Sequence, residues 1–126
     1  MPSSASVRVI SLDREGLLAR LRAVTARLAA EHAEVSEVRL FGSLARGDAT
    51  GISDVDVLLV LCESDEKDPI RRILRYLPFF NLDRGVDLLV YTRDELRRAV
   101  EGGNPFLRRA LDESVLLFPA AGSNAG

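Results

Sequence analysis

The sequence predicts an α/β (α+β) fold, in which helices pack on a small mixed β-sheet. The first observation is that short apolar runs, typical of strands, alternate with segments whose apolar residues follow helical spacing. The second is that residue pairs typical of helix ends, Asp-Pro, Asn-Pro and Gly-Gly, separate these segments. The third is composition, because 126 residues with 47% hydrophobic and 29% charged residues match one globular domain with its own core.

The first expected element is an amphipathic helix over residues 12–30. It would begin at Ser11 or Asp13 as N-cap, and its apolar positions follow helical spacing at Leu17, Leu18, Leu21, Val24 and Leu28. His32 lies at its expected end. A lone histidine there is more typical of a charge partner for the helix end than of a catalytic group.

Two strands and a loop are expected next. The first strand covers residues 35–41, and the second covers residues 55–62. The intervening loop, residues 43–53, has room for a short helical turn at 44–46. The single cysteine, Cys62, ends the second strand, so we expect a buried and inert thiol that forms no internal disulfide.

The second half of the chain predicts three helices and two strands. The expected elements are a helix from Asp68-Pro69 to Leu77, a strand over 86–91, a helix from the Thr92–Glu95 capping box to Val100, a helix over 106–112 and a strand over 115–118. The buried stripe of the first of these helices is predicted to be Ile70, Ile73, Leu74 and Leu77. We expect one folded domain over residues 11–118, with flexible ends at 1–10 and 119–126.

Three aspartates indicate the chemistry. Asp54 and Asp56 open the second strand two residues apart, so their side chains share one face with Cα atoms about 7 Å apart. Asp87 is the second residue of the third strand, and neighbouring strands lie about 4.8 Å apart. If these strands are neighbours, three carboxylates converge, and such hard oxygen donors suit one or two Mg²⁺ ions that also bind substrate phosphates.

A glycine–serine turn precedes these aspartates. Gly42 would let the backbone approach a phosphate without an intervening Cβ, and Ser43 adds a hydroxyl and an N–H for an anion. Arg46 could meet either a phosphate or a carboxylate. Each signal is weak alone, since such a turn is often only a turn and Arg46 alone is more typical of a structural ion pair. Their occurrence together indicates a phosphoryl or nucleotidyl transfer site.

Residues 41–47 (FGSLARG) followed by 53–56 (SDVD) resemble the signature of the polymerase-beta-like nucleotidyltransferase superfamily, and in particular its minimal nucleotidyltransferase branch. The resemblance implies a nucleotidyltransferase domain over residues 11–118 with the superfamily's core fold. It implies that the aspartates hold two Mg²⁺ ions and that the turn holds the β and γ phosphates of ATP. The residues concerned are Asp54, Asp56 and Asp87 for metal and catalysis, and Gly42, Ser43 and Arg46 for the nucleotide.

The same resemblance implies a partner. Members of this branch are similar to antitoxins that transfer AMP from ATP to a tyrosine of a small helical HEPN-type toxin, within a hetero-oligomer. One alternative is a binding antitoxin that acts by occlusion, through apolar residues near Phe79-Phe80 or Phe106, although isolated phenylalanines are more often core. Another is a catalytic subunit that modifies a small molecule such as an aminoglycoside.

Charge and hydropathy argue against two other classes, nucleic-acid-binding proteins and membrane proteins. A net charge of −2 argues against direct nucleic-acid binding, which usually requires a basic face. No apolar run approaches the roughly 18 residues of a membrane span, and the first residues lack the layout of a signal peptide. We therefore expect no membrane contact and a cytoplasmic location.

Overall fold

The structure, a computed structural model, describes residues 13–49 and 54–119 and contains a four-stranded mixed sheet. The sheet order is β3-β2-β1-β4, where β1 is antiparallel to both of its neighbours and β2 is parallel to β3. The strands are β1 (Val35–Phe41), β2 (Val55–Leu61), β3 (Val86–Thr92) and β4 (Val115–Phe118). The predicted mixed sheet with packed helices is therefore confirmed.

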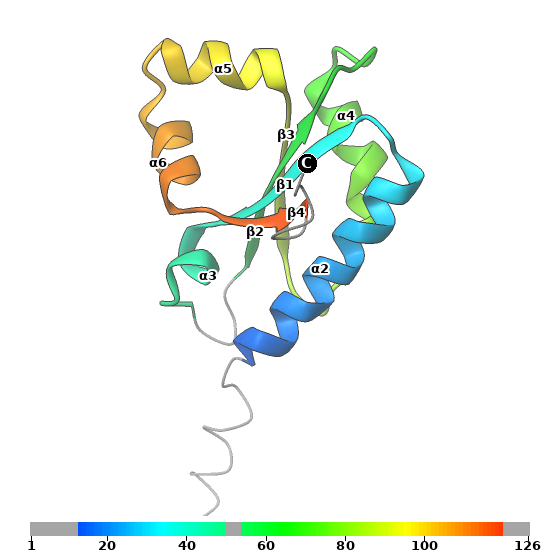
Figure 1. Cartoon of the computed structure of the whole chain (residues 1–126), viewed down its shortest axis with the longest axis vertical. Helices are drawn as coiled ribbons and strands as arrows, with labels where there is room; N and C mark the ends of the chain where they lie inside the picture. The colour runs from blue at the N-terminus through cyan, green and yellow to red at the C-terminus, as the bar shows by residue number, and fades with distance from the viewer. Residues whose placement is uncertain (1–12, 50–53, 120–126) are drawn as a thin grey trace, which may run out of the picture.

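Helices cover both faces of this sheet (Figure 1). One face carries α2 (Arg14–Glu31), α4 (Pro69–Tyr76) and the short 3₁₀ helix η1 (Leu77–Phe80), and the other carries α5 (Arg93–Glu101) and α6 (Pro105–Glu113). The remaining helix, α3 (Gly42–Arg46), follows β1 directly. The first expected helix thus begins at Arg14 with Asp13 as N-cap. None of the described helices has the length and hydropathy that crossing a bilayer requires.

Two apolar cores result, because β2 alternates its side chains between two covered faces. Val57 and Leu59 belong to the larger core under α2 and η1, whereas Leu58 and Val60 belong to a smaller core with Ala110 of α6. The apolar part of the face that carries Asp56 is covered by α5 and α6 of this same chain.

The predicted buried stripe of α4 is confirmed for Ile73 and Leu77, which are partly buried against the larger core, and is wrong for its other two residues. Ile70 and Leu74 are 64% and 58% exposed, and the buried residues are instead Arg72 and Tyr76. Periodicity of apolar residues misplaces the face because two polar side chains occupy the interior, where they are hydrogen-bonded. The hydroxyl of Tyr76 donates to Glu34 Oε2 at 2.7 Å.

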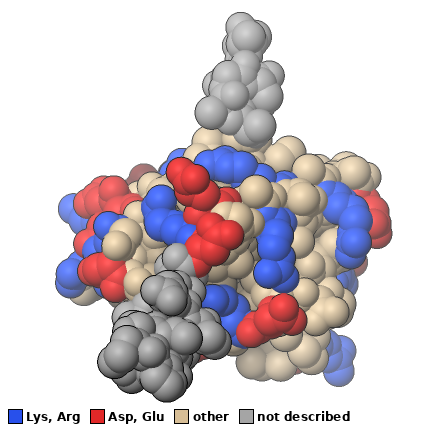
Figure 2. Space-filling model, turned by 90° about the horizontal axis from the view of Figure 1, so that it is seen from below, with Lys and Arg blue, Asp and Glu red and all other residues tan. Residues whose placement is uncertain are grey.

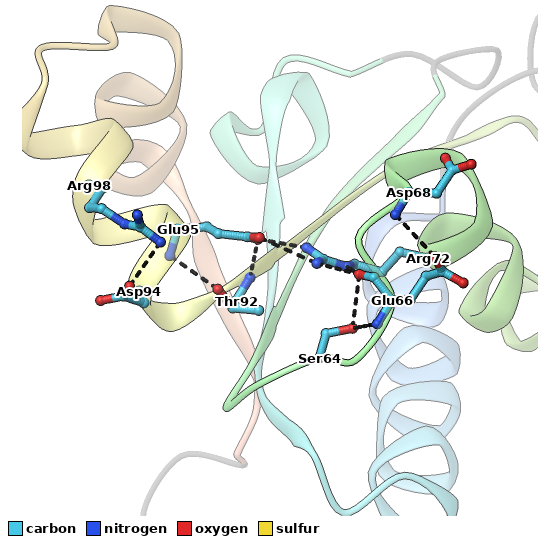
Figure 3. Close-up of polar contacts among 8 residues, drawn as sticks. All are labelled: Ser64, Glu66, Asp68, Arg72, Thr92, Asp94, Glu95 and Arg98. Carbon is cyan, nitrogen blue, oxygen red and sulfur yellow. Dashed lines mark hydrogen bonds and ion pairs between the residues drawn. The ribbon is translucent and has the colours of Figure 1, made fainter.

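The side chain of Arg72 joins the loop between β2 and α4 to the start of α5 through hydrogen bonds (Figure 3). Its Nη2 donates to the carbonyl of Glu66 at 2.6 Å, and its Nη1 donates to Glu95 Oε1 at 2.6 Å. Glu95 in turn accepts from the backbone N–H of Thr92 at 2.9 Å, while Thr92 Oγ1 accepts from the N–H of Glu95 at 3.1 Å. The predicted capping box is confirmed, and it also fixes the guanidinium of Arg72.

Two further expectations are corrected. Cys62 is exposed rather than buried, because β2 ends at Leu61 and the cysteine lies beyond it. Phe80 is buried in the larger core as expected, but Phe106 is 58% exposed. His32 is the C-cap of α2 and its Nδ1 lies 3.1 Å from Glu34 Oε2, in keeping with a role at the helix end. The ends expected to be flexible lie outside the described residues, apart from Pro119.

Candidate active site

The site is organised by the parallel pairing of β2 with β3. Asp56 and Asp87 are register partners in this pairing, so the two carboxylates lie side by side on the face that α6 covers. Asp87 is exposed, whereas Asp56 is only partly accessible. Of the three carboxylates expected to converge, Asp56 and Asp87 are paired directly in this way.

The environment of Asp56 disfavours its charge. Burial raises the pKa of Asp56 above its ordinary value, and the charge of Asp87, a hydrogen bond with Asp87 and the charge of Asp54 raise it further. The nearby Arg46 acts in the opposite direction and lowers this pKa. Asp56 is thus a carboxylate under like-charge repulsion, which a bound cation would relieve.

Two glycines make room for the first aspartate pair. Gly42 has φ of +76°, and a Cβ added there would overlap Oδ2 of Asp56 and lie 3.0 Å from its Cγ. A Cβ on Gly85 would lie 2.5 Å from Oδ1 of Asp54. The sequence prediction assigned Gly42 to close approach of a phosphate. The structure adds that the missing Cβ of Gly42 accommodates Asp56.

Helix α3 is held in place by α2. Arg14 Nε donates to the carbonyl of Leu44 at 3.1 Å, and Arg14 Nη2 donates to that of Ala45 at 3.4 Å. These carbonyls belong to the last turn of α3 and lack helical partners of their own. Arg14 thereby orients the turn that begins at Gly42, a role that no sequence pattern indicated.

A pocket with a volume of about 580 Å³ opens beside the carboxylates. Its charged lining includes Asp56, Asp87 and Arg46, and its apolar lining includes Phe41 and Leu89. The remaining wall is one face of α6, formed at i, i+3, i+4 and i+7 spacing by Phe106, Arg109, Ala110 and Glu113. No local pattern in the sequence indicates that this face belongs to the site, although its helical spacing is visible once α6 is known to lie over the aspartates.

The predicted site residues do not all reach this pocket. Gly42, Arg46, Asp56 and Asp87 line it, whereas Ser43 and Asp54 are absent from its lining. Asp54 still lies close enough for its charge to act on Asp56. Asp54 directly follows residues 50–53, which the structure does not describe.

Arg46 is part of an ion-pair cluster. Its Nε lies 3.2 Å from Asp48 Oδ2, and its Nη1 lies 3.2 Å from Glu113 Oε1. Hydrogen bonds from Arg109 and Arg46 lower the pKa of Glu113. The structural ion pair weighed for Arg46 from sequence is therefore present, and it lies at the wall of the pocket.

Asp56 and Asp87 fit a magnesium ion whose remaining ligands are substrate and water oxygens. Among residues 13–49 and 54–119, no three His, Cys, Asp or Glu side chains are grouped so as to hold a metal by themselves. Mg²⁺, however, is commonly bound by one or two carboxylates together with water and substrate phosphates. The donor chemistry of Asp56 and Asp87, and the repulsion acting on Asp56, suit that mode of binding.

The surface at this end of the molecule has mixed charge. Figure 2 shows the structure from below the view of Figure 1, and in this view basic and acidic side chains are interspersed. The visible face therefore offers contacts of both signs rather than one extended basic region.

Comparison with known proteins agrees with this geometry. Residues 21–117 match the protein family described as "Nucleotidyltransferase domain". The chain is 27% identical over 88 residues to a protein of Methanocaldococcus jannaschii that is provisionally named a protein adenylyltransferase. These 88 residues cover 68% of this chain and 79% of that protein.

Two solved structures share the fold. One is a provisionally named nucleotidyltransferase from Sulfolobus solfataricus, with a TM-score of 0.60 and 25% identity over 82% of this chain and 80% of that one. The other belongs to a toxin–antitoxin structure with AMP-PNP, with a TM-score of 0.54 and 17% identity over 79% of this chain and 74% of that one. The second likeness concerns the fold alone.

Proposed function

The chain belongs to the nucleotidyltransferase domain family, and from this premise we propose that it transfers AMP from ATP to a hydroxyl group of a partner protein. The observation that carries the proposal is the register pairing of Asp56 with Asp87 beside Gly42 in one pocket. The provisional name of the Methanocaldococcus relative supports a protein as acceptor.

In this reaction a bond forms between the acceptor oxygen and the α-phosphorus, while the bond from that phosphorus to the β-phosphate oxygen breaks. Pyrophosphate then leaves. Mg²⁺ bound by Asp56 and Asp87 together with phosphate oxygens, and with Asp54 as the third carboxylate that the family resemblance implies, would neutralise charge on the triphosphate and the acceptor oxygen. Two such ions are expected from the family resemblance.

The chain's own residues would divide the remaining work. Asp87 is the more exposed of the paired carboxylates and lies on edge strand β3, so it can face an incoming acceptor and take its proton. The α3 turn, with Gly42, Ser43 and Arg46, would hold the triphosphate in line with the acceptor. The adjoining apolar wall around Phe41 and Phe106 would exclude water from part of the pocket.

We further propose that the acceptor is a tyrosine of a small helical HEPN-type toxin, which this chain neutralises as an antitoxin. Two likenesses support this setting: the relative provisionally named a protein adenylyltransferase and the toxin–antitoxin structure with AMP-PNP. The binding of AMP-PNP in the latter is in keeping with ATP as the nucleotide here.

The test is mass spectrometry of such a partner after incubation with this chain, ATP and Mg²⁺. A mass gain of one or more AMP units, mapped to a tyrosine and absent with the Asp56→Asn variant, is the expected result. A stable complex without any mass gain would overturn the transfer reaction and leave inhibition by occlusion. Transfer to an added aminoglycoside but not to the partner would assign the chain to small-molecule modification.

A further inference from the structure

Two arginines from different helices meet at one carboxylate in the wall of the pocket. Arg46 of α3 approaches Glu113 Oε1 with its Nη1 at 3.2 Å, and Arg109 of α6 approaches Glu113 Oε2 with its Nε at 3.2 Å. All three residues line the pocket that contains Asp56 and Asp87. Glu113 therefore forms ion pairs with two guanidinium groups that line the same pocket as the carboxylates of Asp56 and Asp87.

Replacing Glu113 by another anion in these ion pairs would cost little folding free energy. The side chain of Arg109 is 76% exposed and that of Arg46 is 38% exposed, so solvent reaches both ion pairs, while Arg46 is also paired with Asp48 through its Nε. Pairs this accessible contribute little to stability, because solvent screens the charges and each long side chain must be held in one geometry. A guanidinium can bind two oxygens of a phosphate at once, with the same geometry as it binds a carboxylate. A phosphate can therefore replace the carboxylate as its partner.

We propose that Arg109, together with Arg46, binds the triphosphate of the nucleotide, and that Glu113 holds both guanidinium groups until the phosphates replace it. This inference rests on the proposed function and adds Arg109 and Glu113 of α6 to the binding site. It gives Arg109 a direct contact with substrate and makes Glu113 an internal competitor of the phosphates.

The charge balance of the pocket supports this assignment. Without the arginines, the charged residues lining it are Asp56, Asp87 and Glu113, all acidic. A nucleoside triphosphate remains negative even with Mg²⁺ bound, so it needs cationic partners in the same wall. Arg46 and Arg109 are the only cations among the described residues that line this pocket.

The test measures binding by calorimetry in the presence of Mg²⁺ and without any acceptor protein, using ATP, inorganic tripolyphosphate and adenosine. Arg109→Gln is expected to weaken ATP and tripolyphosphate binding by about tenfold and to leave adenosine binding unchanged. Glu113→Gln is expected to strengthen tripolyphosphate binding a few-fold, because the competing charge is removed. Arg108→Gln is the matched control, since Arg108 is the exposed neighbour on α6 that does not line the pocket.

Tripolyphosphate affinity unchanged in Arg109→Gln would overturn the contact. Weaker tripolyphosphate binding in Glu113→Gln would overturn the competition, because Glu113 would then be aiding the arginines. If triphosphate binding depends on Arg109 while the mass-spectrometric assay with the partner protein shows no AMP transfer, the proposed function is refuted but the contact stands. A wild-type chain that binds neither ATP nor tripolyphosphate would overturn both.

Discussion

Gly42 and Asp56 occupy space that only a glycine can share, because a Cβ on Gly42 would overlap the Oδ2 atom of Asp56. The two residues belong to different halves of the sequence signature, one in the glycine–serine turn and one in the Asp-x-Asp pair. They come together because Phe41 and Asp56 are register partners in the antiparallel pairing of β1 with β2. The turn and the carboxylate are thus parts of one packed arrangement.

Gly42→Ala is predicted to displace the Asp56 side chain and to lower AMP transfer by about 100-fold or more, a loss typical of a removed electrostatic contact. The positive φ of Gly42 would also cost roughly 1–2 kcal/mol of stability in an alanine variant. Gly103→Ala is the matched control, because Gly103 has φ of +88° but nothing within 4 Å of an added Cβ. Both variants should melt earlier in thermal denaturation, but only Gly42→Ala should lose activity.

Asp56→Asn is predicted to raise the thermal stability of the metal-free protein at pH 7, because it removes a carboxylate whose charged form is disfavoured by burial and by the neighbouring aspartates. The pKa of Asp56 is raised by folding, so its protonated form favours the folded state and that advantage is lost as pH rises through the folded pKa. The difference between variant and wild type should therefore vanish in acid. With Mg²⁺ and ATP the order should reverse, because only the wild type gains stability from binding. A variant that is no more stable than wild type in EDTA at pH 7 would contradict the repulsion.

Asp87→Asn is predicted to keep most of the affinity for Mg²⁺ and ATP but to lose at least 100-fold in AMP transfer, since the acceptor proton loses its receiver. The reason is positional, because Asp87 is exposed on the edge strand while Asp56 and the α3 turn remain. Single-turnover transfer and calorimetry on the same sample separate the two effects. If cells that express the partner toxin are fully protected by this variant, with the complex confirmed by co-purification, protection does not require catalysis.

Arg72→Leu is predicted to lower the free energy of unfolding by about 2–3 kcal/mol, since the partly buried carbonyl of Glu66 and the carboxylate of Glu95 lose charged hydrogen bonds. The hydrogen bond from Arg72 lowers the pKa of Glu95 below its ordinary value of 4.5. This stabilisation is present above pH 4.5 and is lost as pH falls through the lowered folded pKa. The variant should therefore show a shallower loss of stability in acid than the wild type. Arg71→Leu, at an exposed position of the same helix, should unfold like the wild type in urea.

The strands and most helix ends could be predicted from the sequence because each depends on local chemistry. The β1 run, the Asp68 N-cap and the Thr92–Glu95 capping box all lie where the residues indicate. The burial of Arg72 and Tyr76 on α4 could not be predicted in this way. Arg72 is buried only because Glu66 and Glu95, one of them 23 residues away, supply its partners.

In the candidate site, too, the features set by local sequence could be predicted and those set by long-range packing could not. The adjacency of Asp56 and Asp87 follows from strand periodicity once the two strands are assumed to be neighbours, and the parallel pairing makes them so. The contribution of α6 depends on a helix more than 45 residues after Asp56 in the chain folding back over the sheet, so no local pattern could connect Glu113 with Arg46. Contacts of this kind depend on long-range packing, which local sequence patterns do not encode.

Cys62 lies at the opposite end of β2 from Asp56, about 20 Å away at the rise of an extended strand. It is the single cysteine of the chain, its side chain is exposed, and its backbone N–H is anchored to the carbonyl of Glu34 at 2.8 Å. A maleimide dye should therefore attach at one defined position without engineering and without touching the pocket. Resonance energy transfer between this dye and a fluorescent ATP analogue could therefore report nucleotide occupancy in the unmodified sequence.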